Sequence, residues 1–384
     1  MTQTKLSVKN GIDRPELWLD ALRGKRVGLM TNPCGVDRSL TLSSDLLHKA
    51  GSLTCLLSPE HGVRGDRQAG AQVDSYVDRK TGLPVYSLYS SGHRIPTEVL
   101  STLDAVAFDV QDVGARFYTY VYSLSYLMED CAAAGKEMIV FDRLNPLGGE
   151  MIEGTVLDRA YSSFVGRYPI ATRHGLTVGE FARYINATEG IGCKLTVIPV
   201  EHWHRGTLFC DTDLCWIAPS PNLPTFHSAL CYIGTCLFEG TNVSEGRGTT
   251  RPFETVGAPW MDAEAVASAM REMQLPGVMI RPCYFTPTFS KYAGELCGGV
   301  QLHVTDPRTF RPFEVGLRLL CVIRDRHDEF SFTPPSPKGI CFIDLLLGSS
   351  DFRREGYSAQ AMLSLQSKAL ADYRERIAPY LLYS

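Results

Sequence analysis

Short segments made almost wholly of apolar residues alternate with amphipathic segments through the first 200 residues of the chain. The apolar segments are predicted strands at 25–32, 53–58, 83–89, 105–110, 137–142 and 195–200. Apolar residues recur every three or four positions in predicted helices at 40–51, 97–103, about 119–134 and 177–188. Strands that are apolar on both faces and separated by such helices are typical of a parallel sheet with helices on both sides.

The pattern changes after about residue 250, where strands and helices no longer alternate regularly. Helices are predicted there at 262–273, 314–326 and about 358–373, and strands at 278–285 and 298–305. We therefore predict two domains. A larger α/β domain spans residues 1–250, and a smaller mixed α/β domain spans residues 251–384.

Polar residues collect where the predicted strands of the first domain end. The carboxyl ends of parallel strands meet at one edge of a sheet, and ligands bind outside that edge in α/β proteins. A single carboxylate or amide there is equally typical of a helix cap or a turn, but its recurrence after five strands favours a binding site. The candidates are Asn32 after the first strand, Glu60 and His61 after the second, Asp109 and Asp112 after the fourth, Asp142 and Asn145 after the fifth, and residues 201–204 after the sixth.

The most unusual strand end is the sequence Ser-Pro-Glu-His-Gly at residues 58–62. It presents a carboxylate and an imidazole on a turn constrained by proline, and the neighbouring Gly62 and Gly65 leave room for a ligand. Such a pair suits acid–base catalysis or a metal site. A position beside Pro59 partly removes Glu60 from water, which raises the pKa of a carboxyl and suits a proton donor.

The helix predicted after Arg116 carries two different stripes. Its apolar stripe consists of Val121, Leu124, Leu127, Met128 and Cys131, at spacings that fit a buried helix face. A neighbouring aromatic and polar stripe consists of Tyr118, Tyr122, Ser125 or Tyr126, and Glu129. Two interpretations are open: an ordinary exposed flank with Glu129 in water, or a cleft wall where tyrosines stack on a ligand and Glu129 supplies a second carboxylate.

A third polar cluster is the segment FEGTNVSEGRGTTRPFE at residues 238–254. It contains Glu245 and Arg247 together with three glycines that let backbone approach a ligand closely. The segment lies at the boundary between the two predicted domains, which is a common place for a binding cleft. A simple junction loop is the alternative.

Composition and charge exclude several classes of protein. A formal net charge of -4, from 38 basic and 42 acidic residues, argues against a nucleic-acid partner. No apolar run reaches the roughly 18 residues needed to span a bilayer. The N-terminal residues show no secretory leader, so we expect a cytoplasmic protein, or an exported one if a leader has been removed. Most of the 12 cysteines lie in apolar runs and are predicted to be free thiols, with a Cys210–Cys215 disulfide as the alternative.

Several familiar motifs are absent from the sequence. It contains neither GxGxxG after a strand nor GxxxxGK[ST], HExxH or GxSxG, and His202 with His204 lack a carboxylate pattern that would complete a metal site. We therefore predict no cofactor and no metal. Carboxylates beside tyrosines and amides suit hydrolysis of a glycosidic bond, which needs one protonated acid and, in most families, a second carboxylate.

Seven motifs occur in a fixed order from Lys25 to the C-terminus. They are SPEHGVRGD, GLPVYSLY, FDVQDVGARFYTY, Met128-Glu129, VFDRLNPLGG, RHGLTVGEFARYIN and EGTNVSEGRGTTRPFE. Together they resemble the exo-acting β-N-acetylmuramidases of the NamZ type. The resemblance implies a Rossmann-like N-terminal domain, a smaller α/β C-terminal domain that closes a cleft, and release of N-acetylmuramic acid from the non-reducing end of peptidoglycan fragments.

The resemblance also implies two catalytic glutamates. Glu60 falls in the first motif, and Glu129 is assigned as the second, with Glu153 and Glu245 as rivals. The substrate's lactyl carboxylate needs a cation or oriented donors, and arginine suits this task through bidentate pairing. Arg116 and Arg247 are the candidates for it. The other predicted substrate-binding residues are Asn32, His61, Asp109, Asp112, Tyr118, Asp142, Asn145 and Glu245.

Two features depart from the family pattern: DRLNPLGG lacks the proline that more often precedes the asparagine, and no leader is seen. Two other functions remain open from the residues alone. One is a non-catalytic protein that binds cell-wall sugars, and the other is a metal-dependent deacetylase that uses His61, His202 and His204. The sequence does not predict the oligomeric state.

Overall fold

The computed structural model describes residues 5–59, 62–65, 75–88 and 92–384. Its N-terminal part is built on a seven-stranded sheet in the order β3-β4-β2-β1-β5-β6-β9. Neighbouring strands are parallel except for β3 and β4, so the predicted parallel sheet is confirmed. The strands are β1 (Val27–Thr31), β2 (Leu53–Ser58), β3 (Tyr76–Val77), β4 (Pro84–Ser87), β5 (Ala105–Asp109), β6 (Glu137–Phe141) and β9 (Lys194–Ile198).

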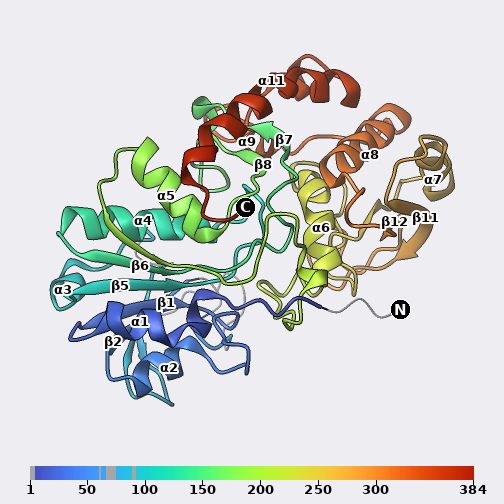
Figure 1. The fold of residues 1–384 in the computed structure, drawn as a ribbon. Coiled ribbons are helices and arrows are strands. Elements are labelled where there is room, and N and C mark those ends of the chain that lie inside the picture. Colours follow the sequence, from blue (N-terminus) through green and yellow to red (C-terminus); the bar gives the residue numbers. More distant parts are fainter. Residues whose placement is uncertain (1–4, 60–61, 66–74, 89–91) are drawn as a thin grey trace.

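Helices cover both faces of this sheet, as Figure 1 shows. One face carries α4 (Tyr120–Ala133) and α5 (Val178–Thr188), and the other carries α1 (Pro15–Leu22) and α2 (Ser43–Lys49). The short helix α3 (Thr97–Ser101) contributes to the core on the α4 side. Strand β5 serves both cores, because Val106 and Phe108 face one side while Ala105 and Ala107 face the other. The apolar strands of the sequence are therefore explained by burial on two faces.

The strand order reverses between β1 and β5. From β1 the chain adds β2 and then β4 on one side, and it returns to add β5, β6 and β9 on the other side. Loops that leave neighbouring strands in opposite directions create a crevice outside their carboxyl ends. The loops after β1, β2, β4 and β5 are therefore the part of the fold in which a ligand site is expected.

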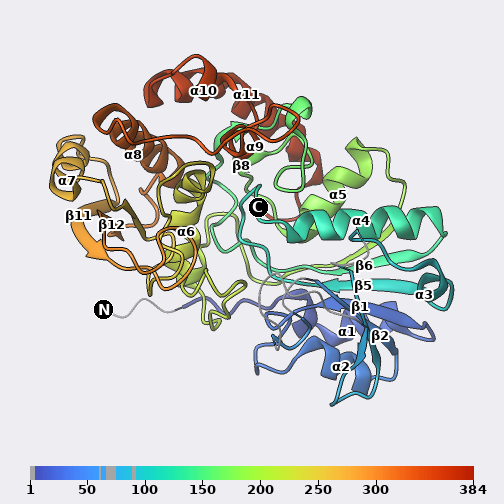
Figure 2. The same ribbon diagram turned by 180° about the vertical axis from the view of Figure 1, so that it is seen from behind.

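The C-terminal part is built on a three-stranded antiparallel sheet in the order β10-β12-β11. Its strands and helices are β10 (Thr255–Ala258), β11 (Val278–Phe285), β12 (Cys297–Val304), α6 (Phe226–Thr235), α7 (Ala263–Glu272) and α8 (Pro312–Arg326). Helices α6 and α8 cross closely, because a Cβ added at Gly234 would lie 1.9 Å from the carbonyl oxygen of Pro312. The view from behind in Figure 2 shows α6 between this sheet and the larger one.

The last residues of the chain return to the N-terminal part. Helix α11 packs against β7, and the backbone N–H of Leu382 donates a 2.9 Å hydrogen bond to Glu180 of α5. The division at residues 250 and 251 stays a prediction. The remaining elements are β7 (Glu153–Val156), β8 (Ala171–Arg173), α9 (Phe342–Leu347), α10 (Asp351–Arg354), α11 (Ala359–Ile377), and the 3-10 turns η1 (Gly11–Asp13), η2 (Arg159–Tyr161), η3 (Phe209–Asp211), η4 (Cys236–Gly240) and η5 (Ala378–Tyr380).

In the described part of the chain, each helix is too short or too polar to cross a lipid bilayer.

Candidate active site

A pocket lies at the carboxyl edge of the large sheet, beside Pro59. Its walls come from β1, from the segments that follow β2 and β4, from the N-terminal turn of α4, and from the segment between β7 and β8. The lining residues are Met30, Pro59, Leu88, His93, Thr119, Tyr120, Ser123 and Phe164. The hydroxyls of Thr119 and Ser123 hydrogen-bond no other group in the described part of the chain. Apolar and aromatic walls with a few polar groups are typical of small-molecule sites, although the described walls enclose only about 10 Å³, the space of a single water.

His93 forms part of an aromatic wall of this pocket. Its ring stacks on Phe164 at a centroid distance of 4.5 Å and on Tyr126 at 5.7 Å. His93 also has a φ of 67°, a left-handed backbone conformation that non-glycine residues rarely adopt and that is concentrated at functional sites. His93 and Phe164 were not predicted from the sequence, because both lie in loops without a periodic pattern.

Glu60 and His61 lie outside the described residues, so their predicted roles stay predictions. They follow Pro59 of this pocket directly in the chain. On the near side of the turn, the buried Ser58 hydroxyl donates a 2.9 Å hydrogen bond to the carbonyl of Pro59. On the far side, the Arg64 guanidinium pairs with Asp78 at 2.6 Å and with Asp45 at 2.9 Å. Both flanks of the turn are therefore held in place.

Two of the predicted strand-end residues shape loops in this structure. The Asn32 side-chain oxygen accepts a 3.0 Å hydrogen bond from the N–H of Cys34. The Asn145 amide donates to the carbonyl of Leu176 at 2.9 Å and accepts from the N–H of Leu147 at 3.0 Å. Both asparagines are 2% exposed, so these bonds hold turns at the sheet edge, and contact with a substrate stays a prediction.

Asp109 and Arg143 form a buried ion pair at the ends of β5 and β6. Two nitrogens of the Arg143 guanidinium donate to the two oxygens of Asp109 at 2.6 and 2.9 Å. Asp109 is 0% exposed, and both of its oxygens face the arginine in a bidentate arrangement. This pair locks the two central loops together.

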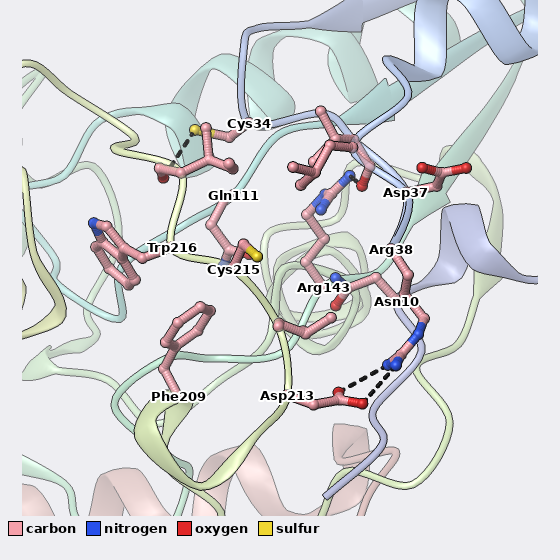
Figure 3. Close-up of a pocket in the computed structure, with 14 residues that line it drawn as sticks. Asn10, Cys34, Asp37, Arg38, Gln111, Arg143, Phe209, Asp213, Cys215 and Trp216 are labelled. Atoms are coloured by element: carbon pink, nitrogen blue, oxygen red, sulfur yellow. Dashed lines mark hydrogen bonds and ion pairs between the residues drawn. The ribbon is translucent and has the colours of Figure 1, made fainter. Parts of the chain in front are cut away.

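Arg143 also lines a second pocket, of about 60 Å³, at the same edge of the sheet (Figure 3). Cys34 and Gln111 line it from the loops after β1 and β5, opposite the rings of Phe209 and Trp216. Burial raises the pKa of the Cys34 thiol to about 12, so this cysteine stays protonated and is a poor nucleophile. Gln111 donates to the carbonyl of Leu144 at 2.9 Å. The polar groups of this pocket are therefore largely engaged with the protein itself.

Asp112 pairs with a histidine that the sequence analysis did not single out. One Asp112 oxygen accepts from the N–H of Gly114 at 2.6 Å and lies 3.2 Å from Nε2 of His174. The N–H of Leu176 donates to Nδ1 of His174 at 3.1 Å, which places the ring proton on Nε2. The other Asp112 oxygen is buried without a hydrogen-bond partner in the described part of the chain.

Asp142 anchors a helix and the C-terminal tail. Its carboxylate accepts from Thr177 at 2.8 Å and from the N–H of Gly179 at 2.7 Å, at the start of α5, and from the Tyr383 hydroxyl at 2.5 Å. Burial raises the pKa of this carboxyl to about 7. Asp142 is 0% exposed and these bonds hold the start of α5 and the C-terminal tail, while its contact with a substrate stays a prediction.

Arg116 joins several segments of this fold from a fully buried position. Its side chain is 0% exposed, and burial lowers its pKa to about 10. The guanidinium donates to the carbonyls of Ile170 at 3.0 Å and of Leu346 at 2.7 Å, and to both oxygens of Thr155. Its contact with a lactyl carboxylate stays a prediction.

The tyrosine stripe of α4 also points largely into the protein. Tyr122 is fully buried and its hydroxyl donates a 2.5 Å hydrogen bond to the carbonyl of Arg116, so this tyrosine packs in the core, while stacking of the stripe on a ligand stays a prediction. Tyr118 is 9% exposed, and its hydroxyl donates to Pro219 at 2.7 Å. Its ring meets that of Tyr120, which does line the pocket, at 5.2 Å. Tyr118 therefore supports the pocket wall from behind.

Glu129 lies near the C-terminal end of α4 and is engaged by two arginines. Its carboxylate oxygens lie 2.6 Å from Arg94 and 2.6 Å from Arg167, and its side chain is 27% exposed. The interpretation of an exposed glutamate free in water is therefore wrong. Its distance to Glu60 lies outside the described residues, so a direct catalytic role stays a prediction.

The segment 238–254 forms a compact ionic cluster. Arg247 pairs with Glu239 at 2.7 Å and with Glu245 at 3.2 Å, and Lys291 reaches Glu245 at 3.0 Å. The Arg247 guanidinium lies 5.0 Å from the centroid of the Phe253 ring, and burial raises the pKa of the Glu239 carboxyl. Arg247 already has two carboxylate partners, and its contact with a lactyl group stays a prediction.

The other candidates lie apart from these clusters. Glu153 pairs at 3.0 Å with the buried Arg173, and burial raises the pKa of its carboxyl. His202 and His204 are exposed. In the described part of the chain, no three His, Cys, Asp or Glu side chains are grouped so that they could hold a metal ion. All 12 cysteines are free thiols, Cys210 among them, which excludes the alternative disulfide in this structure.

The fold and the pocket define a class of protein. It is a two-part α/β protein in which a doubly wound parallel sheet carries an aromatic pocket at its carboxyl edge, backed by buried ion pairs. The chain belongs to the exo-β-N-acetylmuramidase NamZ family, whose N-terminal family model matches residues 27–227 and whose C-terminal family model matches residues 230–383.

Three relatives place the chain within this family. It is 45% identical over 390 residues to the peptidoglycan β-N-acetylmuramidase NamZ of Bacillus subtilis (strain 168), covering 100% of this chain and 93% of that protein. A crystal structure of a DUF1343 family protein from Bacteroides fragilis NCTC 9343 superposes with a TM-score of 0.90 at 35% identity, covering 99% of this chain and 100% of that one. A second such structure from the same organism gives 0.80 at 30% identity, covering 98% and 99%. The resemblance noted from the motifs is thus confirmed.

Proposed function

We propose that this protein is an exo-acting glycoside hydrolase that releases N-acetylmuramic acid from the non-reducing end of peptidoglycan fragments. Its relative from Bacillus subtilis, at 45% identity, is named a peptidoglycan β-N-acetylmuramidase. The observation that carries the proposal is the pocket beside Pro59, with aromatic walls and the two hydroxyls of Thr119 and Ser123. Rings suit the apolar faces of a sugar, and hydroxyls suit its polar edges.

Glu60 is the proposed general acid because it follows Pro59 of this pocket directly in the chain. Hydrolysis breaks the bond between the anomeric carbon and the glycosidic oxygen. The acid gives its proton to that oxygen as the bond breaks, and water supplies the hydroxyl that ends on the anomeric carbon and the proton that restores the acid. The leaving sugar then departs with a neutral hydroxyl.

The test uses a disaccharide with N-acetylmuramic acid at its non-reducing end and a chromogenic glycoside of N-acetylmuramic acid. We expect mass spectrometry to detect free N-acetylmuramic acid from the first, and continuous release of chromophore from the second. Binding of both compounds without turnover would contradict the proposal and favour the sugar-binding alternative. Activity that is lost on treatment with a chelator would favour the metal-dependent alternative.

The role of Glu60 has its own test. Glu60→Gln keeps the size of the side chain but cannot deliver a proton, so we expect turnover to fall by about two orders of magnitude or more. The melting temperature should stay unchanged. Activity of Glu60→Gln within about threefold of the wild type would exclude Glu60 as the general acid while leaving the proposed reaction in place.

A further inference from the structure

Glu129 joins two loops that lie far apart in the sequence. Arg94, in the segment after β4, donates to one oxygen of Glu129, and Arg167, in the segment between β7 and β8, donates to the other, each at 2.6 Å. The neighbouring Asp130 and Ser125 hold the same two arginines at 2.9 and 2.8 Å. Helix α4 thus holds both loops through one short stretch of its surface.

These arginines also lie against an aromatic ring of the same helix. The guanidinium carbon of Arg94 is 4.9 Å from the centroid of Tyr126, and that of Arg167 is 4.1 Å from it. The Tyr126 ring in turn stacks on His93, which precedes Arg94 in the chain. Two loop cations and one loop ring therefore converge on a single side chain of α4.

The loops held in this way carry the aromatic wall of the pocket. His93 stands beside Arg94, and Phe164 stands three residues before Arg167, and the two rings stack on each other at 4.5 Å. His93 is held in a left-handed backbone conformation with a φ of 67°. Such a conformation persists only where the surrounding structure enforces it. The ion pairs of Glu129 are well placed to do so.

The same geometry leaves Glu129 poorly placed to exchange protons. It lies six residues after Ser123, the last α4 residue that lines the pocket, or about 9 Å along the axis of α4. Each of its oxygens already accepts a hydrogen bond from an arginine. A base or nucleophile needs an oxygen lone pair directed at the reacting atoms or at a water between them, and one lone pair of each Glu129 oxygen is directed at an arginine instead.

We propose that Glu129 is a positioning residue: it fixes the two loops whose His93 and Phe164 form the pocket wall, and it does not itself take part in proton transfer. The proposal rests on the proposed function for its kinetic readout. Glu129 is then not the second catalytic carboxylate; its role is to organise the substrate-binding wall. Loosening this wall weakens substrate binding more than it slows the chemical step.

The first experiment compares Glu129→Gln with the wild type and with Glu314→Gln as a matched control. Glu314 on α8 also pairs with an arginine, Arg318 at 2.7 Å, and its side chain is 29% exposed. With the chromogenic glycoside of N-acetylmuramic acid, we expect Glu129→Gln to raise KM about tenfold while kcat stays within about threefold. Glu314→Gln should leave both constants unchanged.

The second experiment tests coupling between Glu129 and the wall. Phe164→Ala should raise KM by a similar factor, and the double variant Glu129→Gln/Phe164→Ala should lose little more than the larger of the single losses, because both changes disrupt one unit. Hydrogen exchange should quicken in peptides covering residues 92–97 and 159–168 of Glu129→Gln, and stay unchanged in Glu314→Gln. If the KM increase of the double variant equals the product of the two single increases, the proposal is overturned.

A third experiment separates positioning from direct catalysis. Glu129→Ala removes the carboxylate altogether, and azide or formate can then occupy the space of a missing base or nucleophile. We expect neither anion to restore turnover and no glycosyl azide to form. Rescue by either anion, or a fall in kcat of about a thousandfold at unchanged KM, would overturn the proposal and make Glu129 catalytic.

These outcomes are distinct from a failure of the proposed function. An inactive wild type would refute the muramidase proposal, and the hydrogen-exchange comparison would still decide whether Glu129 fixes the two loops. An active wild type with Glu129→Gln indistinguishable from it in KM, kcat and hydrogen exchange would refute the positioning role alone.

Discussion

Replacing Arg116 with methionine tests whether this arginine holds the protein together or binds substrate. Methionine has a similar length but no donors, so it fills the space without making the hydrogen bonds. The Arg116 guanidinium donates to the carbonyls of Ile170, Leu346 and Thr155, and to the Thr155 hydroxyl. These acceptors belong to β7, to the segment before β8 and to α9, so the side chain joins three separate parts of the chain.

The expected loss of stability follows from these contacts. Arg116→Met removes four hydrogen bonds from a charged donor, each worth about 1.5–3 kcal/mol. The carbonyls of Ile170 and Thr155 keep a second donor, the N–H of Leu157 and the hydroxyl of Thr172, so the loss per bond lies at the lower end of that range. Removing the buried charge offsets part of this, because the charge is costly to keep out of water and burial already lowers the Arg116 pKa to about 10. We therefore expect Arg116→Met to lower the free energy of unfolding by about 3 kcal/mol. With a urea slope of about 3 kcal/mol per M, the midpoint falls by about 1 M.

The assay combines urea unfolding, followed by circular dichroism, with steady-state kinetics well below the unfolding transition. We expect the KM of the folded fraction for a muramic acid glycoside to stay within about threefold of the wild type. Arg116→Lys serves as a second variant if the methionine protein is poorly folded, and it should show a smaller shift of the midpoint. An unchanged urea midpoint together with a KM raised about thirtyfold would refute the structural interpretation.

Other expected outcomes follow from single contacts. Burial raises the pKa of Glu137, but hydrogen bonds from Thr196, Lys194 and Lys25 outweigh this effect and lower the pKa to about 2. The ionised carboxylate therefore contributes up to about 3 kcal/mol to the free energy of unfolding, fully above about pH 4.5 and progressively less towards pH 2. Glu137→Gln should abolish this part of the pH dependence of unfolding. Tyr383→Phe removes the 2.5 Å hydrogen bond to Asp142 and should speed digestion by carboxypeptidase; an unchanged rate would contradict the anchoring of the tail. Arg247→Lys should raise the KM for muramic acid substrates more than the KM for N-acetylglucosamine substrates. Equal increases in the two KM values would refute the contact of Arg247 with the lactyl group.

The sheet could be predicted from the sequence because its strands are buried on two faces. Strand β5 is apolar at its first four positions, Ala105 to Phe108, and this run of apolar residues is visible without knowledge of its neighbours. The helices between the strands show their apolar stripes for the same reason. The hairpin of β7 and β8 and the short helices α9 and α10 were not predicted, because each is only 3–6 residues long and owes its form to the elements around it.

The position of the candidate site was easier to predict than the role of each residue in it. Polar residues at strand ends were expected to meet at one edge, and Asp109, Asp112 and Asp142 do lie there. Their partners come from distant segments: Arg143 for Asp109, and the C-terminal Tyr383 for Asp142. A sequence does not show which of its polar groups will be satisfied internally, so residues that brace loops look the same as residues that bind a ligand.

The buried carboxylates at the sheet edge and their hydrogen-bond donors limit the positions at which a reaction can occur. Asp109 and Asp142 are fully buried, and their carboxylate oxygens accept hydrogen bonds from other groups of the protein. Such bonds hold loops rigidly, and a rigid frame is what a catalytic group needs to keep its geometry during the reaction. The pocket beside Pro59 differs from them, because its walls are aromatic and two of its hydroxyls are not engaged by described protein groups. The same sheet edge thus combines polar groups that are hydrogen-bonded within the protein with a small aromatic pocket that has two hydroxyls unengaged within the described part of the chain. The glutamate that follows Pro59 is the residue whose replacement most directly tests this division of roles.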